Sequence, residues 1–299
     1  MPLDFVQAAT AGTLDLGDPG GFHRTLARFN QTRLAPQRPH DGWEDDLRAE
    51  TRLRLAEGAF VEAERAAIAE RAATAPTDPD GFVAWFEDLR ETGPGQNDPF
   101  FPWLAEHANR EEMRWFLTQE MAGEAGFDDL VALTQVKFPT QAKLELARNY
   151  WDEMGRGTEA GMHGPMLERI GRELGLKPTI DQTVWEALAL ANMMVALATS
   201  RRYAYHAAGA LGAIELTAPT RVGLVDRGLA RLRVPRKARH YFGIHAVLDK
   251  KHSEAWDREV LRSLVAADPA TARPLAEGAL LRLACGARCF DRYRREFGL

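Results

Sequence analysis

Residues 238–256 of the chain read ARHYFGIHAVLDKKHSEAW, a stretch typical of a helix with apolar flanks. Within it, His245, Asp249 and His252 lie at offsets of four and seven residues. At about 100° per residue, these three side chains leave one face of a helix. Imidazole and carboxylate groups together suit iron, manganese or zinc, although a surface helix with two exposed histidines gives the same pattern. The triplet therefore predicts a metal site only if further ligands come from elsewhere in the chain.

The rest of the sequence predicts an all-α fold, because apolar residues recur at three- and four-residue spacing and strand patterns are scarce. A short helix is expected near Phe22–Arg33 and a long amphipathic one at Trp43–Ala73, with breaks at 74–81 and 92–99. Proline and glycine punctuate the remainder into helices at about 102–122, 125–136, 140–155, 160–174, 182–200, 203–217, 220–232, 237–266 and 269–296. The simplest division is an N-terminal helical extension, residues 1–98, followed by a core bundle, residues 99–299.

Glu215 is a first candidate partner for the triplet. It lies in AGALGAIELTAP, residues 208–219, where a charged side chain is out of place among Ala, Gly, Leu and Ile. Burying a carboxylate there is costly unless a cation compensates its charge. The alternative is a partly exposed glutamate near a helix end.

A second group of candidates lies in KLELARNYWDEMGRGTEAGMHGPML, residues 143–167. Glu153 ends one predicted helix and His163 lies in the next, with glycines between them that let the chain bend. Asp152 is a rival carboxylate. So is Glu159, which would share a helical face with His163 if that helix began early.

A further carboxylate is expected from RWFLTQEMAGEAGFDDL, residues 114–130. Glu120 and Glu124 are four residues apart and so point the same way on a helix. Taken alone, each of these acids fits a solvated helix position better than a ligand role. The set across four helices is what favours a metal site.

These residues resemble the heme-oxygenase-like diiron oxidases and oxygenases, a family of iron-containing redox enzymes. The resemblance runs from about Phe100 to the C-terminus. It rests on NYWDEMGRG with the following histidine, on the lone glutamate of the Ala/Gly-rich helix, and on the His-x-x-x-Asp-x-x-His triplet. It implies a heme-oxygenase-like helical bundle that carries two Fe(II) ions.

The resemblance also implies the metal ligands. Glu153 matches the bridging carboxylate, and His163 matches the histidine that follows it. Glu215 matches the carboxylate of the third helix. The first-helix carboxylate matches Glu120 better than Glu124, which stays open. The full implied set is Glu120, Glu153, His163, Glu215, His245, Asp249 and His252.

The implied activity is O₂-dependent oxidation of a small molecule. Amino-acid-like amine N-oxygenation and oxidative C–C cleavage use the same ligand set, so the substrate stays open, and an external electron donor and a homodimer are both compatible with this interpretation. The alternatives are a helical scaffold protein, or a member of the fold that binds an organic cofactor. A ferritin-like site would need Glu-x-x-His motifs, and the sequence contains none.

Composition argues against some classes of partner. A net charge of −5 and the lack of a recognition motif argue against a nucleic-acid partner. The sequence has neither a signal peptide nor a stretch apolar enough for a membrane helix, which predicts a cytoplasmic protein. Cys285 and Cys289, the only two cysteines, are expected to be reduced, buried thiols. Possible pocket residues are Arg201, Arg202, Tyr203, Tyr205, His206 and Tyr241.

Overall fold

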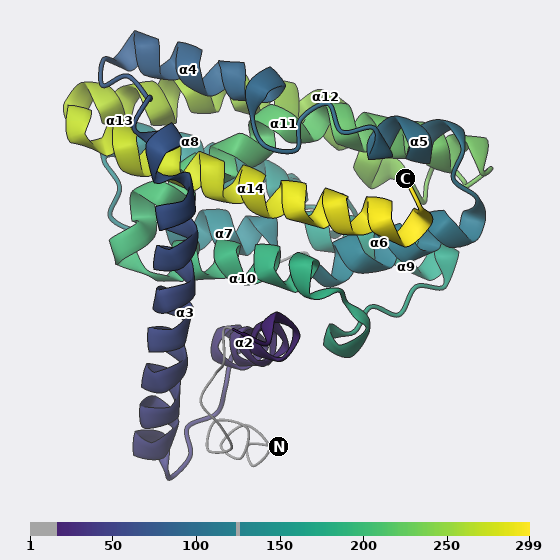
Figure 1. The fold of residues 1–299 in the computed structure, drawn as a ribbon, viewed down its shortest axis with the longest axis horizontal. Helices are drawn as coiled ribbons and strands as arrows, with labels where there is room; N and C mark the ends of the chain where they lie inside the picture. The colour runs from purple at the N-terminus through teal and green to yellow at the C-terminus, as the bar shows by residue number, and fades with distance from the viewer. Residues whose placement is uncertain (1–16, 124–125) are drawn as a thin grey trace.

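The computed structural model describes residues 17–123 and 126–299, and these residues form a helical bundle without β-strands. Figure 1 shows the long helices α11, Ala204–Arg231, and α14, Ala272–Phe297, running across the body of the molecule. Helix α12, His240–Ala255, packs on α11, while α10, Trp185–Thr199, packs on α14. The all-α prediction is therefore confirmed.

Shorter helices surround this centre. In chain order they are α4 (Pro79–Thr92), α5 (Phe100–Glu106), α6 (Arg110–Gly123), α7 (Phe127–Thr134), α8 (Thr140–Glu153), α9 (His163–Leu174) and α13 (Arg262–Ala267). Single 3₁₀ turns η1 (Gly155–Gly157), η2 (Glu159–Gly161), η3 (Ile180–Gln182), η4 (Arg201–Tyr203) and η6 (Pro269–Thr271) connect some of them. A π-helical segment, η5, covers Trp256–Leu261.

The N-terminal helices share the core of the bundle. Helix α2, Pro19–Leu34, packs on α10. Helix α3, Trp43–Ala72, begins away from the body and packs on α14 with its C-terminal half (Figure 1). Phe22 and Phe60 belong to the same buried cluster as Leu211 and Leu275. The division of the chain at residue 98 stays a prediction, but the two segments are in contact through a common hydrophobic core.

Two helix boundaries differ from the prediction. Residues 203–217 and 220–232 form the single helix α11, with Pro219 inside it. Proline removes one N–H and costs about 3 kcal/mol in an isolated helix, so the break was a reasonable expectation. Packing of α11 against α5, α12 and α14 outweighs that cost and keeps the helix continuous.

The predicted helix at 102–122 is two helices, α5 and α6, separated at residues 107–109. The side chain of Asn109 accepts hydrogen bonds from the N–H groups of Glu111 and Glu112. In return, the Glu112 carboxylate accepts the N–H of Asn109, at 2.7 Å. This capping box starts a new helix where the apolar spacing alone suggested continuity.

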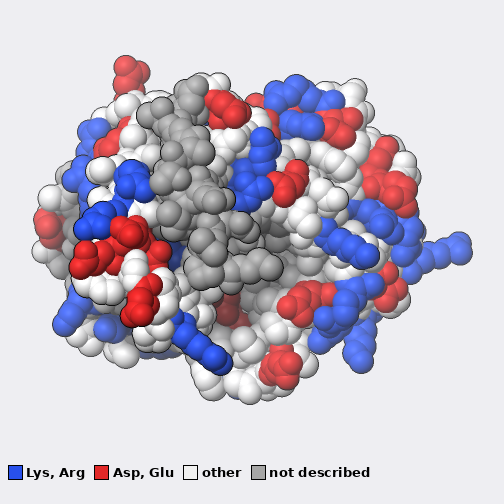
Figure 2. Space-filling view, turned by 90° about the horizontal axis from the view of Figure 1, so that it is seen from below, with Lys and Arg blue, Asp and Glu red and all other residues white. Residues whose placement is uncertain are grey.

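The surface is of mixed charge. Figure 2 shows basic and acidic side chains interspersed on the face that it presents. Among the described residues, no helix is long and apolar enough to cross a membrane. Both cysteines are free and buried, as predicted.

The π-helical segment η5 holds a buried acid that makes stability depend on pH. Burial, and then the negative charge of Glu87, raise the pKa of Asp257 to about 7. Its Oδ1 atom has no hydrogen-bond partner among the described residues. Because the unfolded chain releases this proton near pH 4, native stability falls as the pH rises from about 4 to about 7, and stays low above that.

Replacing Asp257 by Asn is therefore expected to raise the melting temperature. The gain in the free energy of unfolding should reach up to roughly 4 kcal/mol at pH 8 but only about 1.5 kcal/mol at pH 5. Thermal melts at both pH values measure it, with Asp41→Asn at an exposed position as the control. An equal gain at the two pH values would contradict this assignment.

Candidate metal centre

Six of the seven predicted ligands converge in the middle of the bundle, and they come from four helices. Glu153 is the last residue of α8, and His163 is the first of α9. Glu215 comes from α11, and α12 supplies the triplet. All six side chains are buried, at 2–6% exposure, whereas Val247 on the opposite side of α12 is 65% exposed. The three residues of the triplet thus share the inner face of one helix, as their spacing predicted.

A tight reversal of the chain brings Glu153 and His163 together. Between them, the backbone is left-handed at Gly155 (φ +59°), Arg156 and Gly157. A Cβ atom at Gly155 would lie 2.4 Å from the carbonyl carbon of Gly161, so no larger residue fits there. An antiparallel bridge joins Met154 to Met162 across this reversal.

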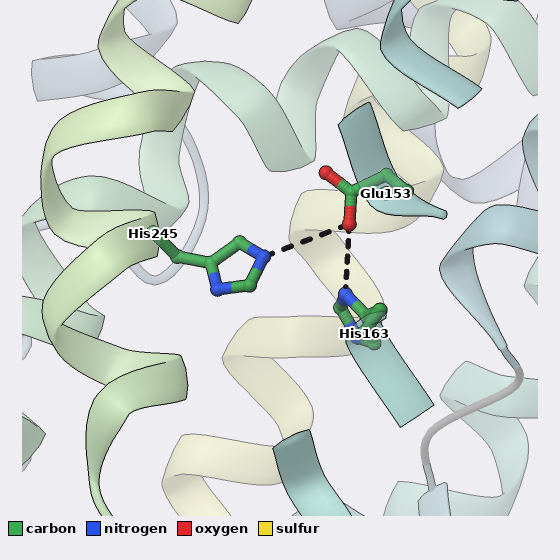
Figure 3. Close-up of side chains that lie close together, drawn as sticks. All are labelled: Glu153, His163 and His245. Atoms are coloured by element: carbon green, nitrogen blue, oxygen red, sulfur yellow. Dashed lines mark hydrogen bonds and ion pairs between the residues drawn. The ribbon is translucent and has the colours of Figure 1, made fainter. Parts of the chain in front are cut away.

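Two groups of ligand atoms share one carboxylate. Glu153, His163 and His245 form the first group, and Glu153, Glu215 and His252 form the second. Within each group the candidate atoms lie within 4.8 Å of one another. Figure 3 shows the first group: the Glu153 carboxylate faces both imidazoles, with Oε2 3.0 Å from Nδ1 of His163 and 3.6 Å from Nε2 of His245.

The second group uses the other side of the same carboxylate. Nδ1 of His252 lies 3.9 Å from Oε1 of Glu153 and 3.5 Å from Oε2 of Glu215. Glu153 therefore points one oxygen at each group. This is the arrangement that a carboxylate bridging two metal ions requires.

The far nitrogens of the three imidazoles have partners of their own. His245 donates Nδ1–H to the carbonyl oxygen of Tyr241 at 2.7 Å, and His252 donates Nε2–H to Asp152 at 3.1 Å. Nε2 of His163 lies 3.3 Å from the Tyr241 hydroxyl. These contacts orient the opposite nitrogens toward the carboxylates, as the outer partners of metal-bound histidines usually do.

Asp249 lies between the two histidines of its helix face. Burial, and then the charge of Glu215, raise the pKa of Asp249 to about 8. Its Oδ1 atom and Nδ1 of His252 are buried without a hydrogen-bond partner among the described residues. Unpaired buried polar atoms of this kind are rare unless a water or an ion satisfies them. The residues present therefore fit a metal centre.

The charges of the site lead to the same conclusion. Burial opposes the charged form of Glu153, yet His163 and His245 hold the pKa of that carboxyl well below its usual range. Burial likewise lowers the pKa of His252, but Glu215 and Asp152 outweigh it and raise that pKa to about 9. The site thus gathers three carboxylates and three imidazoles at low exposure, a set of donor groups that suits a metal cation.

The remaining predicted acids lie elsewhere or take other roles. Glu120 is not part of either group: its Oε1 atom accepts a hydrogen bond from Tyr293 at 2.9 Å, and it lines a cavity beside the centre. Glu124 lies outside the described residues. Glu159 is exposed. Asp152, the other rival, binds Arg156 and His252 through its two oxygens.

Most of the expected pocket residues lie away from the centre. Arg202 and Tyr203 bind Glu62, and His206 binds Glu277, in a network that joins α3, α11 and α14. Arg201 donates to backbone carbonyls that follow α7, and Tyr205 packs on Phe138. Tyr241 alone among those candidates lies at the site.

Asn149 is a site residue that the sequence analysis missed. It is buried, and its amide donates to Oε1 of Glu215 at 2.6 Å. Because it stands one helical turn before Glu153, its place on the same face of α8 could have been inferred from the spacing. A neutral amide among acids gave no chemical signal of that role.

Comparison with known proteins agrees with this geometry. No curated protein matches the chain. A family model described as an iron-containing redox enzyme matches residues 114–287, more than half of the 299 residues, and the matched segment includes all six converging side chains. The chain therefore belongs to the iron-containing redox enzyme family, which has a heme-oxygenase-like fold.

Proposed function

We propose that this protein is an O₂-dependent oxidase or oxygenase that holds two Fe(II) ions and acts on a small molecule. The observation that carries the proposal is the shared position of Glu153, whose two oxygens face two different sets of ligands. A single metal ion would use only one of these buried sets of ligands, whereas two ions would use both.

The ligand assignment follows the two groups. His163 and His245 would hold one ion, His252 and Glu215 the other, and Glu153 both. Asp249 lies close enough to interact electrostatically with both Glu215 and His245. Iron with mixed carboxylate and imidazole ligands supplies O₂ reduction and the oxidation of an organic substrate.

The protein orients the imidazole ligands, keeps the site buried from water and holds protons on side chains of the site. Tyr241 and Asp152 fix which nitrogen of each imidazole faces inward. Since the pKa of His252 is about 9 and that of Asp249 about 8, both groups hold protons near neutral pH before metal binds. Metal binding releases such protons, so the affinity for iron should rise with pH. For oxygenation, electrons would come from an external donor.

Anaerobic loading with Fe(II) tests the proposal. After removal of loosely bound metal, about two iron ions per chain should remain, and their Mössbauer spectrum after oxidation should show a coupled pair. Iron content near one would contradict the two-ion assignment. No retained iron, together with no oxygen uptake across a panel of amines, amino acids and carboxylic acids, would favour a scaffold or an organic-cofactor protein instead.

A further inference from the structure

A cavity of about 170 Å³ lies directly beside the metal centre. His163 and Tyr241, which belong to the first ligand group or hold it in place, line this cavity. Most of its other walls are apolar, with Phe127, Leu167 and Met194 among them. An apolar space of this size can hold a molecule about as large as one aromatic ring. Its position makes it the natural place for a substrate.

Two guanidinium groups interrupt the apolar wall. Arg221, from α11, and Arg282, from α14, both line the cavity. Arg221 is half-buried, and burial together with the charge of Arg282 lowers its pKa to about 9, which still leaves it charged at neutral pH. A charge that is partly removed from water is stabilised by a partner of opposite sign.

The protein holds Arg221 in place without neutralising it. Its guanidinium donates to the hydroxyl of Thr217 at 2.9 Å and lies over the rings of Phe101 and Phe290, at 5.9 and 5.6 Å from their centroids. Its other hydrogen bond goes to the neutral amide of Gln96. Within the described residues, no carboxylate forms an ion pair with Arg221 or Arg282, whereas most other buried or half-buried arginines do, such as Arg33 with Glu57.

The third charged group of the cavity is Glu120, which is held by Tyr293. Its negative charge favours the charged form of Arg221, but by less than burial and Arg282 oppose that form. Among the described residues that line the cavity, two positive charges and one negative charge leave a positive excess. A planar guanidinium suits a carboxylate, which it can bind through two parallel hydrogen bonds.

We propose that this cavity binds a small organic carboxylate, with its charged end between Arg221 and Arg282 and its apolar body in the space that His163 and Tyr241 line. This inference rests on the proposed function, since it names the substrate class of that same site. Two sources share this chemistry. A simple carboxylic acid would use the arginines alone, and an apolar amino acid would also place its ammonium group near Glu120.

Binding rather than turnover tests the proposal. The full chain, loaded with Fe(II) under anaerobic conditions, is titrated calorimetrically with 3-phenylpropanoate, with its neutral amide, and with L-phenylalanine. At least one of the two carboxylates should bind about tenfold or more tightly than the amide, because the amide cannot pair with the guanidinium charges. Equal binding of acid and amide, or no binding of any probe, would overturn the proposal.

Arg282→Met is the informative variant, because Arg282, unlike Arg221, makes no hydrogen bond or ion pair with the described residues. It should weaken carboxylate binding about tenfold or more and leave binding of the amide unchanged. Arg292→Met, on the same helix but outside the cavity, is the matched control. Unchanged carboxylate affinity in the Arg282→Met variant would overturn the proposal that the two arginines bind the carboxylate.

Arg221→Lys keeps a positive charge but loses the planar guanidinium that can donate two parallel hydrogen bonds. It should therefore weaken binding of the carboxylates more than binding of the amide. Thermal melts establish that each variant is folded. Glu120→Gln separates the two sources. If this variant loses affinity for L-phenylalanine but not for 3-phenylpropanoate, the ligand is an amino acid. If the affinities for both probes stay unchanged, the ligand is a simple acid. Iron content, measured on the same samples, shows separately whether the metal centre has failed.

Discussion

Replacing Glu153 by Gln is expected to reduce the iron content of the protein from about two ions per chain to well below one. The amide keeps the shape of the side chain, but it has no negative charge and only one oxygen. Since Glu153 supplies an oxygen to each ligand group, loss of its carboxylate weakens the binding of both ions. Anaerobic Fe(II) loading followed by iron analysis measures the effect.

Two further variants make this result specific. His163→Ala removes a ligand from the first group only, so about one ion per chain should remain. Glu159→Gln changes an exposed glutamate six residues from Glu153 and should leave the iron content at the level of the unmodified protein. If Glu153→Gln kept both ions, the shared-carboxylate assignment would be wrong.

Replacing Gly209 by Ala is expected to cause the largest loss of stability. A Cβ atom at Gly209 would lie 1.9 Å from the carbonyl oxygen of Leu275, and one at Gly278 would lie 1.9 Å from that of His206. Helices α11 and α14 therefore cross with their backbones in contact. Neither the added Cβ atom nor the backbone oxygen that it meets can rotate away, so the two helices must separate.

The expected cost is at or above the upper end of the roughly 1–3 kcal/mol typical of overpacked cores. Urea unfolding followed by circular dichroism measures it. Gly58→Ala is the control, since Gly58 lies within α3 and a Cβ there meets no atom within 4 Å. That change should stabilise the protein by about 0.5–1 kcal/mol. Similar stability of the two variants would refute the close crossing.

The fold was predictable where sequence spacing and packing agree. The shared face of the α12 triplet followed from the helical period alone, because offsets of four and seven residues return to the same side of a helix. The burial of that face did not follow from the spacing, since an exposed helix gives the same pattern. The continuity of α11 through Pro219 was not predictable, since it depends on neighbours that are distant in the sequence. The break before α6 could have been recognised from Asn109 and Glu112, had their capping pattern been weighed against the apolar spacing.

The metal centre was partly predictable for a similar reason. Glu215 stood out because a charge among small apolar residues needs compensation, and the structure buries it as that argument requires. Glu120 and Glu124 could not be told apart, because residues four apart on a helix carry the same directional signal. Arg221 and Arg282 gave no signal at all, since arginine is common on solvated faces and only the fold brings these two to one cavity.

The reversal between α8 and α9 has a consequence for how this sequence can change. Its backbone contacts at Gly155 and Gly161, and the bridge between Met154 and Met162, fix the path of the chain from one ligand to the next. Most surface loops absorb insertions and deletions readily. This one cannot, because an added or deleted residue would displace His163 from Glu153. The number of residues in this segment is therefore under the same constraint as the identity of the two ligands at its ends.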